Sequence, residues 1–181
     1  MIVSKIKKRV FKLIWAWEEE KEERWLREMA NKGWLLQSYF IGFYTFVKSE
    51  PGDYIYKLDY RVDIDEKEYL NIFEDAGWTH VAQFLGWHYF RVKADQCDYP
   101  EIYSDNVSKI HKYKSLLKLL VIVTLTNLFN VINIVFINRS GPFFENGFVT
   151  GFQIVMLSVL VFLLYGIFKI TNVLKDLKDE L

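Results

Sequence analysis

The pattern of polar and apolar positions divides the chain near residue 113. Segment 1–113 mixes charged residues with aromatic and aliphatic ones, and it contains 17 Lys and Arg and 19 Asp and Glu residues. Beyond it, only 6 basic and 4 acidic residues remain, at the edges of long apolar runs. The two parts therefore fit different solvents: the first is typical of a small water-soluble domain, and the second of a membrane segment.

Two long apolar runs make up most of the second part. Residues 119–137 and 149–168 contain no charged side chain, and at ~1.5 Å per residue each is long enough to cross a bilayer core of ~30 Å. The short connection contains two glycines and a proline, which favour a tight loop. The pattern predicts a transmembrane hairpin in segment 119–181; the alternative is a pair of buried helices in a soluble protein.

Basic residues flank the two runs on the sides away from the loop, whereas the loop contains Arg139 and the acidic Glu145. Because cytoplasmic flanks are enriched in Lys and Arg, the pattern predicts a multi-pass protein of the cell membrane, with two spans and both termini in the cytoplasm. The flanking residues are Lys109, Lys112, Lys114 and Lys118 before the first run, and Lys169, Lys175 and Lys178 after the second.

Polar side chains interrupt both runs. Thr126, Asn130 and Asn133 fall on one helical face of the first run, and Gln153 and Ser158 lie in the second. Amides facing lipid are unfavourable, so we expect this face to pack on protein, with a hydrogen bond of roughly 1 kcal/mol between Asn133 and Gln153. The face could serve only to pack the two helices, or it could form an oligomer interface or a polar site.

Two segments of the first part match at a fixed offset of 44 residues, 25–48 and 69–92, without a gap. A Gly-Trp pair stands at the same place in both, and a second glycine follows nine residues after the first. The match predicts an internal repeat, with repeat 1 at about 8–50 and repeat 2 at about 52–95. The aligned pairs include Leu26/Leu70, Gly33/Gly77, Trp34/Trp78, Gly42/Gly86 and Phe46/Phe90.

Each repeat predicts the same order of elements. An amphipathic helix, 17–31 in the first repeat, ends at a glycine suited to its C-cap. A tryptophan then opens a strand, and two aromatic-rich strands form a hairpin around the second glycine. A further strand precedes each helix, at 9–15 and 54–62. The predicted fold class is α+β, with two tandem strand-helix-strand-strand repeats that form an antiparallel sheet with the helices on one face.

The domain organisation follows from these elements. Residues 1–103 are predicted to form the cytoplasmic domain. Residues 104–118 are predicted to form a membrane-proximal linker helix, capped by Ser104 or Asp105, that continues into the first span.

Residues that could carry chemistry are scattered. In the second hairpin we expect His80 opposite Arg91 and His88 opposite Gln83, which does not make a metal pair.

His111 lies in the basic linker, and Cys97, the only cysteine, stands near two aspartates that disfavour a reactive thiolate. Residues 74–75, Glu-Asp, end a helix and suit a solvent-exposed turn better than an acid/base pair. No Gly-rich phosphate loop is present. We therefore predict a protein that is not an enzyme and has no cofactor and no metal site. The zero net charge gives no sign of nucleic-acid binding.

Aromatic residues around the two hairpins are the remaining signal. If the repeats pack side by side, their faces form a cleft, and such interfaces are common places for apolar pockets. The alternative is that these residues only pack the sheets. The set predicted to form a ligand or partner groove is Trp34, Phe43, Tyr44, Trp78, Trp87 and Tyr89.

Two stretches carry a resemblance to a known family: KKRVFKLIWAWEEEKEERWLREMANKGW and, after it, GFYTFVKSEPGDYIYKLDY. They closely resemble the bacterial membrane-associated family catalogued as domain of unknown function 2812. The resemblance covers about residues 7–113, and paired spans behind it are common in the family. It implies no established activity, and frequent gene neighbours of the PadR regulator type imply a regulatory or sensory setting. The doubled element order also looks like tandem GyrI-like small-molecule-binding modules. Neither resemblance transfers binding residues.

These observations favour a membrane-anchored regulatory or sensory protein. Its cytoplasmic domain is expected to bind a partner protein or a small amphipathic ligand without catalysis, and the hairpin could pair it with itself. The alternative is an accessory structural subunit of a membrane transporter or signalling complex, recognised through the transmembrane hairpin. The two hypotheses differ in whether the domain or the spans make the recognition contacts.

Overall fold

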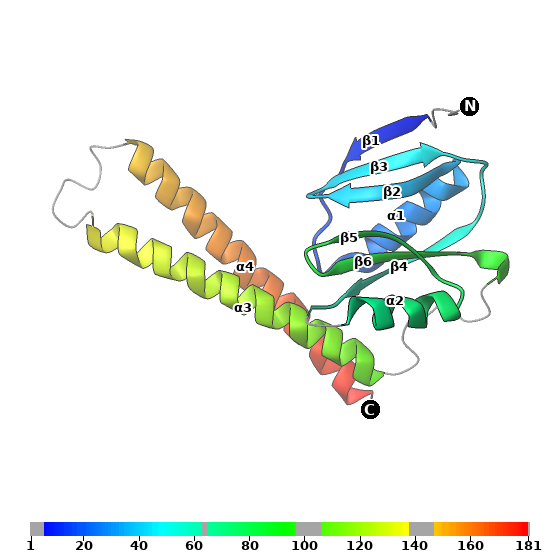
Figure 1. Cartoon of the computed structure of the whole chain (residues 1–181). Coiled ribbons are helices and arrows are strands. Elements are labelled where there is room, and N and C mark those ends of the chain that lie inside the picture. Colours follow the sequence, from blue (N-terminus) through cyan, green and yellow to red (C-terminus); the bar gives the residue numbers. More distant parts are fainter. Residues whose placement is uncertain (1–5, 63–64, 97–105, 138–146, 181) are drawn as a thin grey trace. The chain divides into compact units, whose positions relative to one another are not determined.

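The computed structural model describes residues 6–62, 65–96, 106–137 and 147–180. The chain divides into two compact units, Met1–Asp105 and Asn106–Leu181, each described here by itself (Figure 1). Three predicted features lie outside the described residues: Cys97, the cap at Ser104 or Asp105, and the loop between the apolar runs.

The first unit contains the order strand-helix-strand-strand twice. The first set is β1 (Lys7–Phe11), α1 (Glu19–Asn31), β2 (Trp34–Phe40) and β3 (Phe43–Lys48). The second set is β4 (Tyr54–Tyr60), α2 (Glu66–Asp75), β5 (Thr79–Phe84) and β6 (Trp87–Lys93), followed by the short 3-10 helix η1 (Ala94–Gln96). The predicted α+β class and element order are confirmed.

The helix ends follow the local sequence signals. The side chain of Asp65 caps α2 by accepting from the backbone N–H groups of Lys67 and Glu68, at 3.1 and 3.2 Å. Gly33 and Gly77 follow α1 and α2 with positive φ angles of 76° and 83°. Only glycine adopts this conformation without strain, so the two predicted C-cap glycines end the helices as expected.

Two boundaries around α1 differ from the expected ones. β1 ends at Phe11 instead of residue 15, and α1 begins at Glu19 instead of residue 17. Between them the N–H of Glu18 donates to the carbonyl of Trp15 at 2.8 Å, and the rings of Trp15 and Trp17 stack. A turn therefore occupies aromatic positions whose composition had suggested a longer strand and a longer helix.

The strands form two three-stranded antiparallel sheets, ordered β1-β3-β2 and β4-β6-β5, in place of one continuous sheet. β2 and β5 lie close to each other at the junction of the sheets, but neither pairs with the other in a ladder. The middle strand of each sheet is the last strand of its repeat, so the two sheets have the same strand order.

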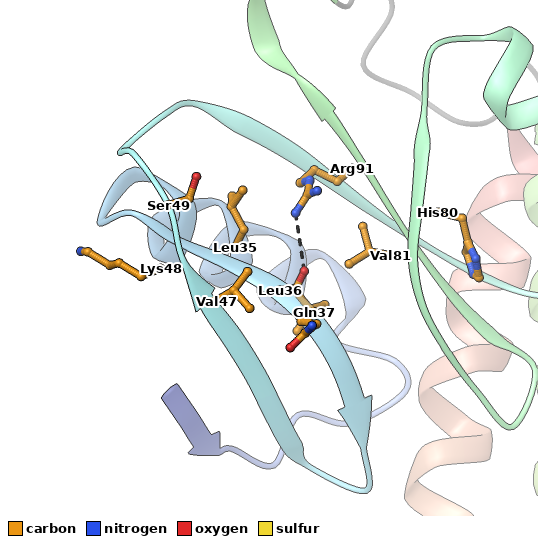
Figure 2. A pocket seen from close by; sticks show the side chains of 9 residues that line it. All are labelled: Leu35, Leu36, Gln37, Val47, Lys48, Ser49, His80, Val81 and Arg91. Carbon is orange, nitrogen blue, oxygen red and sulfur yellow. Dashed lines mark hydrogen bonds between the residues drawn. The ribbon is translucent and has the colours of Figure 1, made fainter. Parts of the chain in front are cut away.

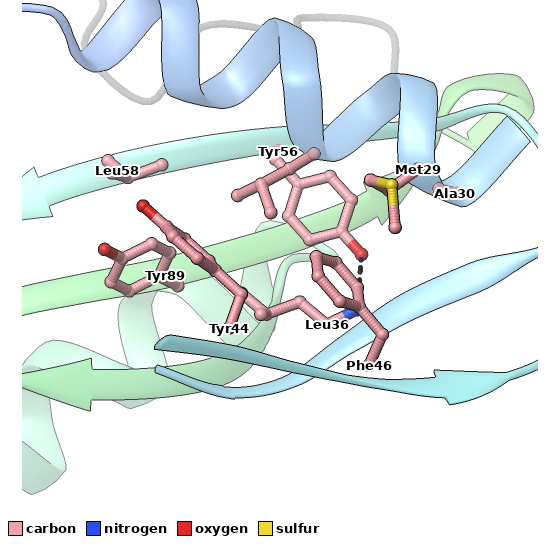
Figure 3. Packing of buried hydrophobic residues seen from close by; sticks show 9 residues of the cluster. Met29, Ala30, Leu36, Tyr44, Phe46, Tyr56, Leu58 and Tyr89 are labelled. Atoms are coloured by element: carbon pink, nitrogen blue, oxygen red, sulfur yellow. Dashed lines mark hydrogen bonds between the residues drawn. The ribbon is translucent and has the colours of Figure 1, made fainter. Parts of the chain in front are cut away.

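One hydrophobic core joins the two repeats (Figure 3). Leu26 and Ala30 of α1 and Phe46 of β3 are fully shielded from solvent, and Tyr56 and Leu58 of β4 belong to the same cluster. Helix α1 accordingly packs on both sheets, through β2 and β4, whereas α2 packs on β5. The second sheet also has a smaller cluster of its own, formed by Phe73, Trp78, Phe90 and Val92.

The second unit consists of α3 (Asn106–Ile137) and α4 (Gly147–Asp179), which pack against each other. Both helices are long and apolar enough to cross a membrane, with mean hydropathies of 1.9 and 2.3 over their most apolar parts. Only 17% of each such stretch is buried, whereas core helices of soluble proteins are mostly buried. α3 runs without a break through the predicted linker and the first predicted span.

The predicted polar face of α3 is not the face that packs on α4. Thr124 and Asn127 are buried, at 7% and 8% exposure, and Asn127 Nδ2 lies 3.8 Å from Met156 Sδ of α4. Thr126 and Asn130 are exposed, and their side chains donate to carbonyls four residues back in α3. Such local bonds satisfy the polar groups without a partner helix.

The predicted hydrogen bond between Asn133 and Gln153 is not made. Asn133 Nδ2 donates to the carbonyl of Phe129 in its own helix at 2.7 Å. Gln153 Nε2 is buried with no hydrogen-bond partner among the described residues. Ser158 of α4 is exposed and donates to Ile154 O at 2.8 Å, so packing of the exposed polar residues on another molecule stays a prediction.

Candidate ligand-binding site

Each sheet has a β-bulge on the strand that lies next to the other sheet. The register of β2 shifts between Leu36 and Ser38, and that of β5 shifts between His80 and Ala82. The residues inside the two shifts, Gln37 and Val81, are aligned by the offset of 44. A bulge leaves one residue unpaired and increases the local twist, which explains why β2 and β5 meet without continuing one sheet.

Side chains of the second repeat bond to the backbone of β2 at its bulge. The N–H of Leu36 donates to Tyr56 Oη at 3.2 Å, and Arg91 Nη1 donates to the carbonyl of Leu36 at 3.5 Å. Leu36 is only 2% exposed, so its backbone groups need partners from the protein. The two bonds fasten the first sheet to the second exactly where the ladder is interrupted.

A cavity of about 330 Å³ opens at this junction (Figure 2). Leucine and valine side chains form its apolar walls, and Figure 2 shows Arg91 directed from the second sheet toward the carbonyl of Leu36. Among the described residues, no aspartate or glutamate lines the cavity. We call it the junction cavity; its lining residues are Leu35, Leu36, Gln37, Val47, Lys48, Ser49, His80, Val81 and Arg91.

Aromatic rings hold both cations of the junction cavity. Lys48 Nζ lies 4.9 Å from the ring centroid of Trp34, and the Arg91 guanidinium lies 5.4 Å from that of Tyr54. Within the part of the chain that the structure describes, neither cation forms an ion pair. An aromatic face attracts a cation without neutralising it. Lys48 Nζ also donates to the carbonyl of Lys32 at 3.5 Å, and Figure 2 shows its side chain directed away from Arg91, so Arg91 is the cation inside the junction cavity.

His80 is half-buried at the edge of the junction cavity, and its burial lowers its pKa. It lies opposite Phe90 instead of Arg91, because the bulge at Val81 shifts the register by one residue. His88 is opposite Gln83 as predicted. The two imidazole rings are 5.5 Å apart between centroids, closer than the sequence suggested.

The second histidine lies deeper. His88 is 2% exposed, and burial followed by the neighbouring His80 lowers its pKa. Nδ1 of His88 and Nε2 of His80 are buried without a hydrogen-bond partner among the described residues. In the same part of the chain, no three His, Cys, Asp or Glu side chains come together as metal ligands would.

A buried carboxyl group lies inside the large core. Glu22 of α1 is 6% exposed, and its Oε1 accepts from Tyr44 Oη at 2.7 Å and from Tyr89 Oη at 2.9 Å. Burial raises the pKa of Glu22, and the two hydroxyl donors oppose that rise. Tyr44 comes from the first repeat and Tyr89 from the second, so one carboxyl group bonds to both.

Among the six predicted groove residues, Tyr44 and Tyr89 meet at Glu22 inside the large core, and Trp34 and Trp87 pack against the same core. Phe43 is 38% exposed at the tip of the first hairpin, and Trp78 belongs to the small core of the second sheet. Trp87 packs on Tyr60, and Trp34 contacts Lys48 next to the junction cavity. None of the six lines that cavity.

The predicted groove between the repeats stays a prediction, and its six residues differ from those that line the junction cavity. Gln37, Lys48, Val81 and Arg91 were missed as lining residues. The offset of 44 aligns Gln37 with Val81 and is the one signal that could have pointed to the junction. The identity of these residues gives no sign of a bulge.

Comparison with known proteins gives one match. A model of the family described as "Protein of unknown function (DUF2812)" matches residues 18–125, which is more than half of the chain and extends from the start of α1 into α3. No curated protein and no solved structure matches the chain.

Proposed function

The chain belongs to the family DUF2812, whose function is unknown, and from that premise we propose that it is a membrane-anchored sensory protein whose first unit binds a small amphipathic anion without catalysing a reaction. The observation that carries the proposal is the junction cavity, where apolar walls stand beside the guanidinium of Arg91, and Lys48 adds a second positive charge to the lining. A ligand with an apolar body and a carboxylate or phosphate group matches both features.

Position within the fold supports a sensory role. The junction cavity lies between two sheets that share a hydrophobic core and a few side-chain bonds, including Arg91 to Leu36, but no common ladder. A ligand that bonds to Arg91 competes for the guanidinium that fastens the sheets. Binding would therefore change how firmly the repeats hold each other, which is a response that a partner protein can detect.

The two apolar helices support the membrane anchor. Their length, hydropathy and low burial fit a hairpin in lipid, and the basic flanks favour a cytoplasmic first unit. Because α3 continues from Asn106 into the first apolar run, a displacement at its start would be passed along a rigid helix.

The test uses the full chain in mild detergent and a panel of amphipathic anions, cations and neutral analogues. All six tryptophans lie in the first unit, so intrinsic fluorescence and thermal unfolding report on that unit alone. We expect anions to raise the unfolding temperature and to change the emission of Trp34, which contacts Lys48. A response to cations, or to no member of the panel, would contradict the proposal.

Two variants with the same loss of charge locate the binding. Lys48→Gln should weaken binding of a responding anion roughly tenfold, or about 1.4 kcal/mol, because it removes one charge-assisted hydrogen bond. Lys93→Gln, on β6 and also exposed, removes an equal charge outside the lining of the junction cavity. Equal losses in both variants would show that the anion responds only to general positive charge.

A second candidate function is the accessory subunit. The exposed polar residues Thr126, Asn130 and Ser158 favour it, because polar side chains on a lipid-facing surface are typical of contacts with another membrane protein. Replacing Asn130 by Leu should release a co-purifying membrane partner if the spans make the recognition contacts. Replacing the buried Asn127 would instead disturb the contact between α3 and α4 and serves as the comparison.

A further inference from the structure

The tips of the two hairpins expose large apolar side chains. Ile41 at the β2–β3 turn and Leu85 at the β5–β6 turn are 55% and 76% exposed. Other exposed residues surround the first tip on β1, β2 and β3 and on the segment that follows β1. We call this set the apolar rim: Phe11, Leu13, Phe40, Ile41, Phe43 and Leu85, each between 38% and 76% exposed.

Contacts between neighbours make the apolar rim continuous. The rings of Phe11 and Phe43 are 4.8 Å apart between centroids. Phe40 at the first tip lies 5.2 Å from Phe84, the residue before Leu85 at the second tip. The two hairpin tips therefore lie side by side and form one surface. Exposed apolar surface of this extent, built on two loops, marks an interaction site in a soluble domain.

Backbone strain at both hairpin tips is a second sign that the apolar rim is an interaction surface. Ile41 and Leu85 have positive φ angles, 39° and 47°. Hairpin turns of this kind strongly favour Asn, Asp or Gly, and a β-branched residue with positive φ is a genuine outlier. Each tip thus places a bulky apolar residue where a small polar one would fold more easily, and both repeats do so independently.

All charged side chains on the two hairpins and on β1 are basic. Neither hairpin contains an acidic residue from 34 to 48 or from 79 to 93, and β1 contains none either. The Arg9 guanidinium lies 4.5 Å from the ring centroid of Phe43. The backbone N–H groups of Lys12 and Arg61 donate to Gly42 O and Gly86 O, both at 2.8 Å, so a basic residue follows the strand beside each tip. The Arg61 side chain is paired with Asp59, so the unpaired excess of positive charge lies at the first tip.

We propose that the apolar rim docks on the surface of an anionic lipid bilayer, with the hairpin tips at the boundary between headgroups and acyl chains. Apolar tips among basic residues are the combination that such a surface binds. The proposal rests on the membrane anchor of the proposed function, which holds the first unit near lipid at a high effective concentration. It is independent of the junction cavity and its ligand.

The experiment places a fluorescent NBD label on the full chain in nanodiscs. In a Cys97→Ser background, single cysteines are introduced at Leu85 in the apolar rim, at the exposed Glu50 beyond the opposite end of β3, and at the exposed Leu164 of α4. The discs contain phosphatidylcholine alone or mixed with phosphatidylglycerol, with and without nitroxide-labelled lipids. The expected result is a blue shift and a loss of emission on nitroxide addition at position 85, larger with phosphatidylglycerol, and neither effect at position 50.

Position 164 separates the two proposals. If the label there is quenched while the label at 85 keeps the emission of a solvent-exposed probe, the membrane anchor is supported and lipid docking of the apolar rim is overturned. If the label at 164 is not quenched, the anchor itself fails and the docking fails with it. A blue shift at 85 without quenching by lipid nitroxides shows that protein, from a second copy or another partner, covers the apolar rim, and this also overturns the proposal.

Ile41→Asn removes an apolar side chain while relieving strain. Asn tolerates positive φ better than Ile, so this variant should unfold at a higher temperature than the wild type. It should nevertheless reduce the quenching at position 85 in phosphatidylglycerol discs. A purely structural role for Ile41 predicts the reverse for stability and no change in quenching, and that result would contradict the docking.

Discussion

The two repeats of the first unit link helix to sheet with the same chemical groups but in opposite directions. In the first repeat, Tyr44 on β3 donates to Glu22 on α1. In the second, Tyr69 on α2 donates to Asp59 on β4 at 2.8 Å. Both carboxyl groups are buried, at 6% and 0% exposure. A tyrosine–carboxyl hydrogen bond thus links helix and sheet in both repeats, and the element that supplies each group differs.

The cross-strand partners at corresponding positions also differ between the two sheets. Val10 lies opposite Tyr44 in the first sheet, and Asp59 lies opposite His88 at the corresponding place of the second. The first repeat thus has a buried acid on its helix with a raised pKa, whereas the second has a buried and a half-buried histidine on its strands, both with lowered pKa values. The same element order therefore carries pKa shifts that favour the uncharged form of an acid in one repeat and of two bases in the other.

The largest expected contrast concerns the aligned leucines of the two helices. Leu26 is fully buried in the core that joins the repeats, and Leu70 is only half-buried. Leu26→Ala should destabilise the first unit by about 3 to 5 kcal/mol, and Leu70→Ala by about 1 to 2 kcal/mol. Equilibrium unfolding of the full chain in mild detergent, followed by tryptophan fluorescence, measures both. Equal losses would mean that the two helices share the core equally.

Next in size are the aligned C-cap glycines. An added Cβ at Gly33 would lie 2.7 Å from Ser49 O, whereas at Gly77 it would meet nothing within 4 Å. Both residues have positive φ, which alone makes alanine unfavourable by about 1 to 2 kcal/mol. Gly33→Ala should therefore cost more than Gly77→Ala by a further ~1 kcal/mol or more. Thermal unfolding of the pair would contradict the predicted difference if the two midpoints coincided.

A smaller contrast separates the two tyrosines. Tyr44→Phe removes one of two hydroxyl donors to the deeply buried Glu22 and should destabilise by about 1 to 2 kcal/mol. Tyr69→Phe leaves Asp59 with Arg61 Nε at 3.2 Å, and Tyr69 is only half-buried. Its expected loss is about 0.5 to 1 kcal/mol. A larger loss for Tyr69→Phe in chemical denaturation would reverse the order of the two links.

The smallest effect is the net dependence of stability on pH, because the repeats act against each other. Burial raises the pKa of Glu23 on α1 to about 7, so its contribution is full below about 4.5 and is lost as pH rises toward 7. The lowered pKa values of His80 and His88 give a contribution that is present above 6.5 and lost as pH falls below it.

Single variants should separate the pH dependence of stability due to Glu23 from that due to the histidines. Glu23→Gln should reduce the fall in stability toward pH 7, and the raised pKa of Glu22 should leave a smaller fall of the same sign. His88→Gln removes part of the opposite slope, and the protein should then gain stability on acidification. Denaturation midpoints measured across this pH range give both results. Parallel pH profiles for the two variants would show that the histidines and Glu23 do not titrate in the folded protein as described.

Much of this architecture could be predicted from the repeat, because its signals are local. Gly33 and Gly77 mark helix ends through backbone conformation, and the hairpin turns at Gly42 and Gly86 follow the same rule. The bulges could not be predicted, since Gln37 and Val81 are ordinary strand residues. Without the bulges, the register of His80 and the division into two sheets could not be derived, and so neither could the lining of the junction cavity.

In the second unit, helical periodicity could not predict which face of α3 packs on α4. It grouped Thr126 and Asn130 on one face correctly, but it could not say which face meets α4. Each of these side chains bonds to a carbonyl of its own helix, so polarity alone did not decide the packing. Asn127, one position away from Thr126, makes the contact instead.

Glu23 also affects how readily the first unit aggregates through the edge strands of its sheets. Its Oε1 accepts from the N–H of Leu58 at 2.9 Å, and its Oε2 pairs with Lys57 at 3.2 Å, so a side chain occupies a ladder position on the outer edge of β4. The outer edge of the other sheet, β1, carries Lys7, Lys8 and Arg9. A backbone N–H group on the edge of β4 is thus already bonded to a side chain, and the edge of β1 carries positive charge. Both features disfavour the addition of a further strand to the sheets.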